Sequence, residues 1–366
     1  MSKYPLLTID HEALRSNMKQ VMSWCRDEGI DVAGVIKASS GMASVALDYE
    51  YCGASWIASS RLEQLQRARE EGVKIPLMMI RVPMISELAE MIEVCDYSLQ
   101  SEFATLKALE EVAVKADKKH KVILMADLGD LREGFFEVEE LVDVAKYVED
   151  KLDFVQLAGI GTNLGCYGSV MPTKEKMEQL VAYAEAVEEA IGRKLDIISG
   201  GATSSLMPVF DKEMPERVNM LRIGAVSLVG PQEDLRTCYG REEVDALTEA
   251  FTLEAEVIEV KTKATHPIGK LGVDAFGQKP KYRDRGMRQR ALLAIGRADF
   301  GDTDDLVPQL EGAEVVGASG DHTILDIEDC SEIVKVGDKV KFKLKYSAIM
   351  RLTSSENVKI NEVDRL

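Results

Sequence analysis

Short apolar runs alternate with longer amphipathic stretches through the first two thirds of this 366-residue chain. Runs of this kind are typical of buried parallel strands, and the stretches between them are typical of helices. The predicted strands are residues 32–37, 55–58, 77–81, 96–99, 122–126, 154–160, 196–199 and 219–223. Eight strands alternating with helices over about 200 residues predict the α/β class and a (β/α)8 TIM-type barrel. An open doubly wound sheet is disfavoured because no GxGxxG turn follows an early strand.

The alternation stops after about Pro231, where glycine, proline and aspartate begin to separate short strand-like runs. These later strands are predicted at residues 253–260, 291–294, 314–317, 323–327 and 339–344. We therefore expect a barrel domain over residues 11–231 and a second, all-β domain over 232–366. An apolar strand within residues 1–10 is expected to join the β domain, and Asp10 is expected to cap the helix that follows.

Charge and cysteine usage limit the classes of partner. The formal net charge of −18 argues against binding to a nucleic acid or an anionic membrane, and no apolar run approaches the length of a membrane span. The first residues lack the apolar core of a signal peptide. The six cysteines form no CxxC pair, which favours reduced thiols and a cytoplasmic location.

Histidines are few, and none is expected to bind metal. The chain has four, and no two are spaced as a ligand pair. His11, in the first turn of a predicted helix, is expected on the surface, and His120 is expected in a solvated turn. The basic run between Lys279 and Arg290 is interpreted as an ion-paired face or a subunit contact.

The first predicted barrel strand ends at Lys37, directly before the turn Ser39-Ser40-Gly41. Burying a lysine disfavours its charged form, so the amine is expected to shift toward the neutral nucleophile that an imine-forming enzyme needs. The alternative is a lysine that ends a strand and reaches solvent. The loops after strands seven and eight add a second signal.

Glycine turns follow both of those strands. They read Ser199-Gly200-Gly201-Ala202-Thr203-Ser204-Ser205 and Leu221-Arg222-Ile223-Gly224-Ala225. Backbone N–H groups and hydroxyls in such turns bind phosphate, and these are the two barrel loops in which phosphate sites recur. Each turn alone has an ordinary structural explanation, but both together with Lys37 favour a phosphate-bearing cofactor.

Several longer motifs complete the pattern. They are Gly34-Val35-Ile36-Lys37, Arg81-Val82-Pro83-Met84, Asp127-Leu128-Gly129-Asp130-Leu131-Arg132-Glu133-Gly134, Gly161-Thr162-Asn163-Leu164-Gly165-Cys166-Tyr167-Gly168, Gly272-Val273-Asp274-Ala275-Phe276-Gly277, Asp284-Arg285-Gly286 and Ala294-Ile295-Gly296. With these motifs the chain resembles, nearly end to end, the alanine-racemase-like (fold-type III) pyridoxal-phosphate enzymes, and most closely their ornithine racemase branch.

The resemblance implies a role for each matching residue. Lys37 would hold pyridoxal 5'-phosphate covalently, and Arg132 would lie near the substrate carboxylate, a bidentate role suited to a guanidinium. Arg222 would face the pyridine nitrogen, and Asn163 would lie against the cofactor ring. The residues expected around the phosphate are Thr203, Ser204, Gly224 and Ala225.

Racemisation needs a proton acceptor on each face of the substrate α-carbon, and Lys37 can serve one face. The resemblance implies a tyrosine from a partner subunit for the other face, but this chain has Phe276 there, which has no exchangeable proton. We expect His322 to replace it, with Asp321 binding or orienting the substrate. Cys166 and Asp274 are further candidates.

The resemblance thus implies an amino-acid racemase, a homodimer with a shared active site, acting on a basic amino acid such as ornithine or lysine. The alternatives are other pyridoxal-phosphate chemistry on this fold, such as a D-amino-acid aldolase or a decarboxylase, and a cofactor carrier. The sequence alone does not define the substrate side chain.

Overall fold

The computed structural model describes residues 3–277, 279 and 281–366, and the chain divides into two compact units. One unit contains Leu14–Lys37 and Gly41–Leu247. The other contains the described residues up to Ala13, together with Ala38–Ser40 and Thr248–Arg365. The first is an α/β barrel and the second an antiparallel β unit, which confirms the predicted fold class.

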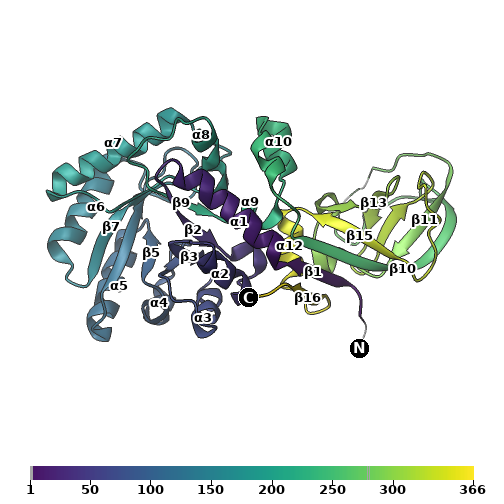
Figure 1. The fold of residues 1–366 in the computed structure, drawn as a ribbon, viewed down its shortest axis with the longest axis horizontal. Helices are drawn as coiled ribbons and strands as arrows, with labels where there is room; N and C mark the ends of the chain where they lie inside the picture. Colours follow the sequence, from purple (N-terminus) through teal and green to yellow (C-terminus); the bar gives the residue numbers. More distant parts are fainter. Residues whose placement is uncertain (1–2, 278, 280) are drawn as a thin grey trace. The chain divides into compact units, whose positions relative to one another are not determined.

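Within the described residues, eight parallel strands close into a barrel in chain order (Figure 1). The strands are β2 (Asp31–Val35), β3 (Trp56–Ser59), β4 (Leu77–Met79), β5 (Tyr97–Gln100), β6 (His120–Met125), β7 (Val155–Gly161), β8 (Ile197–Ser199) and β9 (Met220–Ile223). Each overlaps a strand predicted from the sequence. The barrel interior is filled by small and apolar side chains, including Ala33, Val35, Met78, Leu99 and Met220, so the barrel is a packed core.

Helices α1 to α8 surround the barrel strands, and the short helices α9 and α10 follow the last strand (Figure 1). They are α1 (His11–Arg26), α2 (Ala43–Tyr51), α3 (Leu62–Glu70), α4 (Leu88–Val94), α5 (Phe103–Ala116), α6 (Val138–Lys151), α7 (Lys174–Ile191), α8 (Leu206–Phe210), α9 (Ala225–Val229) and α10 (Glu233–Tyr239). Asp10 caps α1 as predicted, because its Oδ1 accepts the Ala13 N–H at 2.9 Å.

The second unit is built on a sheet in the order β12-β15-β10-β11-β14-β13. Its strands are β10 (Phe251–Ala264), β11 (Met287–Leu293), β12 (Leu306–Pro308), β13 (Glu314–Ala318), β14 (Thr323–Asp326) and β15 (Lys339–Leu344), with helices α11 (Arg297–Phe300) and α12 (Tyr346–Leu352). The N-terminal strand β1 (Leu6–Asp10) pairs with β10 on one side and with the last strand, β16 (Lys359–Val363), on the other.

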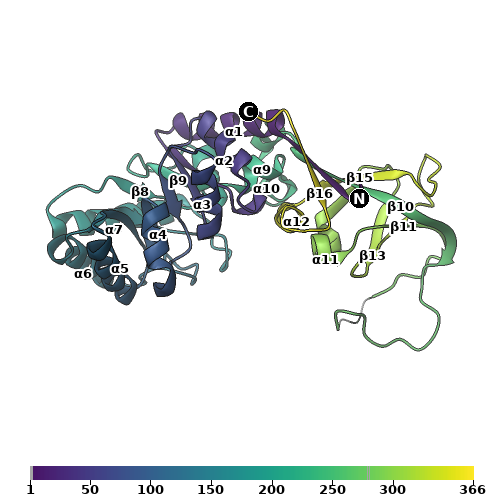
Figure 2. The ribbon, with the colours of Figure 1, turned by 90° about the horizontal axis from the view of Figure 1, so that it is seen from below.

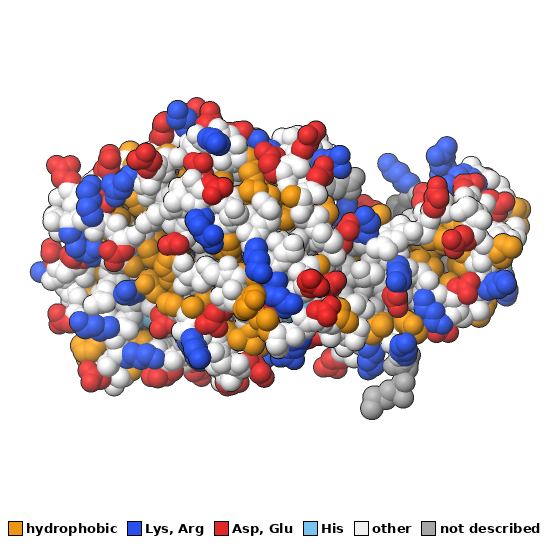
Figure 3. All heavy atoms as spheres, in the orientation of Figure 1, with side chains coloured by type: hydrophobic (Ala, Val, Ile, Leu, Met, Phe, Trp, Pro, Cys, Tyr) orange, Lys and Arg blue, Asp and Glu red, His pale blue; other side chains and the backbone are white. Residues whose placement is uncertain are grey.

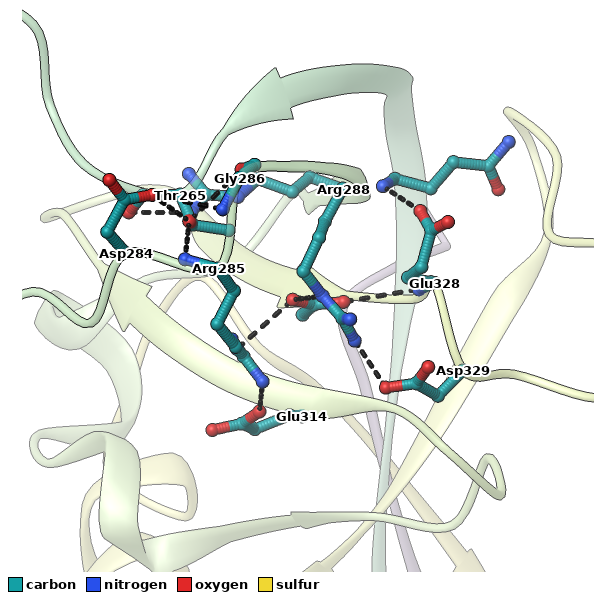
Figure 4. A network of polar contacts seen from close by, with 11 residues as sticks. Thr265, Asp284, Arg285, Gly286, Arg288, Glu314, Glu328 and Asp329 are labelled. Atoms are coloured by element: carbon teal, nitrogen blue, oxygen red, sulfur yellow. Dashed lines mark hydrogen bonds and ion pairs between the residues drawn. The ribbon is translucent and has the colours of Figure 1, made fainter.

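The connection from β10 to β11 is a long irregular loop that leaves the sheet, as Figure 2 shows. Its base is closed by the polar network of Figure 4. The Asp326 carboxylate, 1% exposed, accepts hydrogen bonds from Arg288 Nε at 2.6 Å and pairs with Arg285 at 3.1 Å. Arg285 also bonds Glu314 at 2.7 Å, and Thr265 Oγ1 accepts the Arg285 N–H at 2.6 Å. Arg285 and Arg288 of the basic run are therefore ion-paired, as expected.

Two histidine predictions are wrong. His11 is fully buried at the start of α1, and His120 is the first residue of β6 and only 1% exposed. The His120 Nε2 atom lies 2.9 Å from Ser98 Oγ, and burial lowers the pKa of His120 to about 4. The lysines that precede His120 suggested a solvated turn, but the strand begins at the histidine itself.

Charged side chains of both signs are interspersed over the face seen in Figure 3. Many are partnered, such as Arg193 with Glu149 at 2.7 Å and Arg217 with Glu188. Among the described residues, no helix has both the length and the apolar character that a membrane crossing requires.

Candidate functional site at the carboxyl ends of the barrel strands

Lys37 lies just beyond the carboxyl end of β2. The strand ends at Val35, two residues earlier than predicted, and the Ile36 N–H still donates to Ala58 O at 3.0 Å before Lys37 opens a 3-10 turn. Ala33 and Val35 pack in the barrel core, and Lys37 follows at the mouth that the carboxyl ends of the strands form. Lys37 is half-buried.

Arg222 on β9 joins the ends of three neighbouring strands. Its Nη1 donates to Ser199 Oγ at the end of β8, and its Nη2 donates to Thr162 O, just after β7, at 2.8 Å. The residue is 4% exposed, and desolvation lowers the pKa of Arg222 to about 10, so the guanidinium stays charged at neutral pH. It is a buried cation whose hydrogen bonds go to neutral oxygens.

The loop after β6 has a closed, strained backbone. Asp127 Oδ1 accepts the N–H groups of Gly129 at 2.9 Å and Leu131 at 3.1 Å, and Leu131 has a φ of 58°. Gly134 has a φ of 137°, and a Cβ there would lie 2.4 Å from Asp127 N. This loop presents Arg132, whose side chain is 42% exposed and ion-paired with Glu133.

A residue that the sequence analysis did not single out joins this loop to the one after β7. The Asp130 carboxylate accepts the N–H groups of Gly165 and Tyr167, each at 3.0 Å. The signal in the sequence was an acidic residue two positions before Arg132, in a motif used only for its arginine. Two motifs far apart in sequence are thereby held together.

Asn163 and Cys166 lie on the loop that Asp130 holds. Asn163 is 9% exposed, and its Nδ2 has no hydrogen-bond partner among the described residues. Cys166 Sγ donates to Asn163 Oδ1 at 3.7 Å. The hydrogen bond to Glu133 raises the pKa of Arg132 against the effect of partial burial.

The two glycine turns close the same end of the barrel. After β8, Gly201 has a φ of 121°, and Thr203 begins a 3-10 turn in which Ser204 Oγ donates to Leu164 O at 2.8 Å. After β9, a Cβ at Gly224 would lie 2.6 Å from Val35 O, so only glycine lets the turn before Ala225 approach β2 this closely. Both turns are next to strands that carry other site residues.

Asp321 and His322 belong to the β unit, in the turn between β13 and β14. The Ser319 N–H donates to His322 O at 2.8 Å, and the Arg297 N–H donates to Ser319 O at 2.8 Å. Both side chains are exposed. The turn is thus held by its backbone, and its two polar side chains remain accessible.

Phe276 and Asp274 lie on the long loop of the β unit. Asp274 Oδ1 accepts the Phe276 N–H at 2.9 Å, and the Arg297 guanidinium lies over the Phe276 ring, 4.2 Å from its centre. The ring is 45% exposed. An aromatic side chain without an exchangeable proton therefore has a cation fixed over its ring, an attractive arrangement.

Comparison with known proteins finds relatives over nearly the whole chain. Residues 9–231 match the family described as "Alanine racemase, N-terminal domain". The chain is 37% identical to an ornithine racemase of Acetoanaerobium sticklandii, covering 97% of this chain and 98% of that protein. It is 36% identical to a lysine racemase of Thermotoga maritima, covering 96% of each. In fold it is similar to an alanine racemase of Streptomyces lavendulae, with a TM-score of 0.76, 18% identity and coverage of 100% and 99%.

Proposed function

Because the chain belongs to the alanine racemase family and is an amino-acid racemase, we propose that it uses pyridoxal 5'-phosphate to interconvert the L- and D-enantiomers of a basic amino acid, ornithine or lysine. The substrate class rests on one observation. More than a third of the residues are identical, over almost the full length, to those of relatives named for these two amino acids. The expected aldolase, decarboxylase and carrier alternatives have no comparable support.

The residues at the barrel mouth fit the cofactor. Asn163 offers a buried N–H donor without a partner in the described chain, and Arg222 offers a buried guanidinium that bonds the carbonyl of Thr162, the preceding residue. Lys37 would hold the cofactor covalently, Arg222 would face its ring nitrogen and Asn163 its ring. The turns with Thr203, Ser204, Gly224 and Ala225 would hold the phosphate. When bound, the cofactor supplies electron withdrawal from the substrate α-carbon.

Arg222 keeps its own protons at neutral pH, even though burial lowers its pKa to about 10. It therefore does not readily protonate a ring nitrogen, in contrast to a carboxylic acid. Weaker electron withdrawal favours rapid return of the α-proton over elimination or transamination. This preference supports racemisation as the reaction.

Two groups of the chain would exchange the α-proton. Lys37 Nζ would take or return it on one face, and the His322 imidazole would do so on the other, with Asp321 binding or orienting the substrate. Arg132 would bind the substrate carboxylate through its guanidinium. Exposed Asp321 and His322 side chains on a backbone-held turn support this assignment.

We further propose a homodimer with a shared active site. The loop between β10 and β11 exposes apolar side chains, such as Ile268 at 93% and Val273 at 62%, which a second copy would cover. All six cysteines are free thiols, which supports a cytoplasmic location. Light scattering at several protein concentrations tests the dimer, and a monomer at all of them contradicts it.

One experiment tests the proposed reaction. Purified protein is supplied with pyridoxal phosphate, its visible absorbance is recorded, and single enantiomers of ornithine, lysine and alanine are incubated with it before chiral chromatography. We expect both enantiomers to appear fastest from ornithine or lysine, and a Lys37→Ala variant to lose the absorbance band and the turnover. Equal turnover by that variant, or cofactor binding without turnover of any amino acid, would overturn the proposal.

A further inference from the structure

One buried carboxylate organises the whole loop after β7. Asp130 is 1% exposed and accepts N–H groups from Gly165 and Tyr167 at 3.0 Å and from Val170 at 3.4 Å. Burial alone would raise the pKa of this carboxyl, but these hydrogen bonds bring it below its ordinary value. A Cβ at Gly168 would lie 2.7 Å from Asp130 O, so the loop also packs tightly on the backbone of this residue.

The held loop determines where the Cys166 thiol lies. Cys166 stands between two residues whose N–H groups Asp130 accepts, so its backbone is fixed on both sides. Its Sγ donates to Asn163 Oδ1 at 3.7 Å, and this engages the carboxamide oxygen. The Nδ2 group must then point away from the thiol, and it is the buried donor without a partner among the described residues.

We infer that Asp130 is a positioning residue: through the 165–170 loop it places Cys166, which orients the Asn163 carboxamide so that Nδ2 donates to the bound cofactor or substrate. The inference rests on the proposed binding of pyridoxal phosphate at this end of the barrel. It assigns no proton transfer to Cys166. A purely structural role for Asp130 would stabilise the loop without affecting what Asn163 binds.

The same unit contains a matched control. The Glu110 carboxylate accepts N–H groups from Asp153 at 2.9 Å and Val155 at 2.8 Å, at the amino end of β7. Glu110→Gln therefore removes a carboxylate of the same kind from the opposite end of the strand. Asp130→Asn and Glu110→Gln should loosen their own loops alike, but only the first should alter the site.

The first measurement needs no cofactor. The full-length variants are treated with iodoacetamide, and alkylation of each cysteine is followed by mass spectrometry, with the exposed thiol of Cys238 as internal reference. We expect Asp130→Asn to change the alkylation rate of Cys166 about threefold to tenfold relative to Cys238, together with faster amide exchange in residues 165–170. Glu110→Gln should leave Cys166 at the wild-type rate. An unchanged Cys166 in Asp130→Asn overturns the inference.

The second measurement is a titration with pyridoxal phosphate followed by visible absorbance. Asp130→Asn and Cys166→Ala should each weaken affinity about tenfold and shift the absorbance maximum, as expected for loss of one oriented hydrogen bond. Cys166→Ser keeps a donor and should restore most of the affinity, while Glu110→Gln should bind as wild type does. Wild-type affinity in Cys166→Ala, or equal loss in Glu110→Gln, overturns the inference.

The two proposals fail in distinguishable ways. If Lys37→Ala binds pyridoxal phosphate with wild-type affinity and absorbance, the proposed function fails, whatever Asp130→Asn does. If Lys37→Ala loses the cofactor band but Asp130→Asn and Cys166→Ala match wild type, the proposed function stands and only the positioning role is wrong. Should Asp130→Asn not fold, the Cys166→Ala and Cys166→Ser pair decides the question, because Cys166 is exposed.

Discussion

The guanidinium of Arg297 lies 4.2 Å from the centre of the Phe276 ring. Phe276 stands where the family resemblance implies a proton-transferring tyrosine, and neither a phenyl ring nor a guanidinium readily exchanges a proton at neutral pH. The pair is therefore suited to packing and to attracting anions, and our proposal assigns the second proton acceptor to another group. This makes the exposed imidazole of the same unit the first residue to test.

His322→Ala should lower racemisation at least about 100-fold, because one of two general acid–base groups is lost. In deuterium oxide, the α-proton of one enantiomer should still exchange through Lys37, whereas that of the other should not. His266→Ala is the control, since His266 is in the same unit and its Nδ1 is 2.8 Å from Pro267 O. Undiminished racemisation in both directions in His322→Ala would remove this histidine from the mechanism.

Arg222→Lys should destabilise the barrel even without cofactor. Arg222 reaches Ser199 Oγ and Thr162 O with two separate nitrogens, whereas lysine has a shorter side chain with one nitrogen. We therefore expect one buried acceptor to lose its donor, at a cost of about 1–3 kcal/mol. Urea unfolding of the two proteins without added cofactor measures the difference. Arg217→Lys, at a partly exposed ion pair with Glu188, serves for comparison and should cost less. Equal stability of Arg222→Lys and wild type would contradict the expectation.

His120 should make the protein acid-sensitive. Burial lowers the pKa of His120 from 6.5 to about 4, so the unfolded chain binds a proton there that the folded chain excludes. Well above pH 6.5 His120 is neutral in both states and does not affect the free energy of unfolding. That free energy falls as the pH drops from 6.5 toward 4, because only the unfolded chain gains the proton. By pH 5 wild type should lose about 2 kcal/mol that a His120→Gln variant does not lose. Urea unfolding of both proteins between pH 7 and pH 5 measures the difference, and an equal loss of unfolding free energy in the two would contradict this role of His120.

Asp326→Asn should open the base of the long β10–β11 loop. The Asp326 carboxylate is buried and pairs with Arg285 and Arg288. Burial raises its pKa, but the hydrogen bond from Arg288 and the charges of both arginines bring it below its ordinary value. Loss of the charge should cost about 2–4 kcal/mol and speed proteolysis within residues 266–284. Glu178→Gln, at a pair in which both side chains are about half exposed, should change stability by less than about 0.5 kcal/mol. A proteolysis rate like that of wild type would contradict the proposal that Asp326 closes the base of this loop.

Periodicity alone located all eight barrel strands, because buried parallel strands are apolar on both faces and stand out from amphipathic helices. The ends of these strands were predicted less accurately. The sequence predicted a strand through Lys37, but the chain turns after Ile36, since the Gly41 N–H bonds Ile36 O at 3.0 Å. Hydrophobic periodicity does not indicate such a turn, so it could not predict where this strand ends.

The candidate site was predicted through motifs, and the bonds between motifs were missed. Arg132 and Asn163 were named for their roles, but Asp130, two positions before Arg132, was passed over although its carboxylate joins their loops. The burial of His11 was missed for a similar reason, because a polar residue in a first helical turn is usually exposed. Contacts over a long sequence separation require the folded chain.

The position of β1 between β10 and β16 has a consequence for synthesis on the ribosome. All strands of the barrel leave the ribosome before β10, whereas Leu6–Asp10, made before the barrel, must wait for Lys359–Val363 before both of its edges are paired. A nascent chain stalled before β16 would therefore carry a closed barrel and leave the β1 edge that β16 covers bare, the kind of surface that chaperones and neighbouring chains bind.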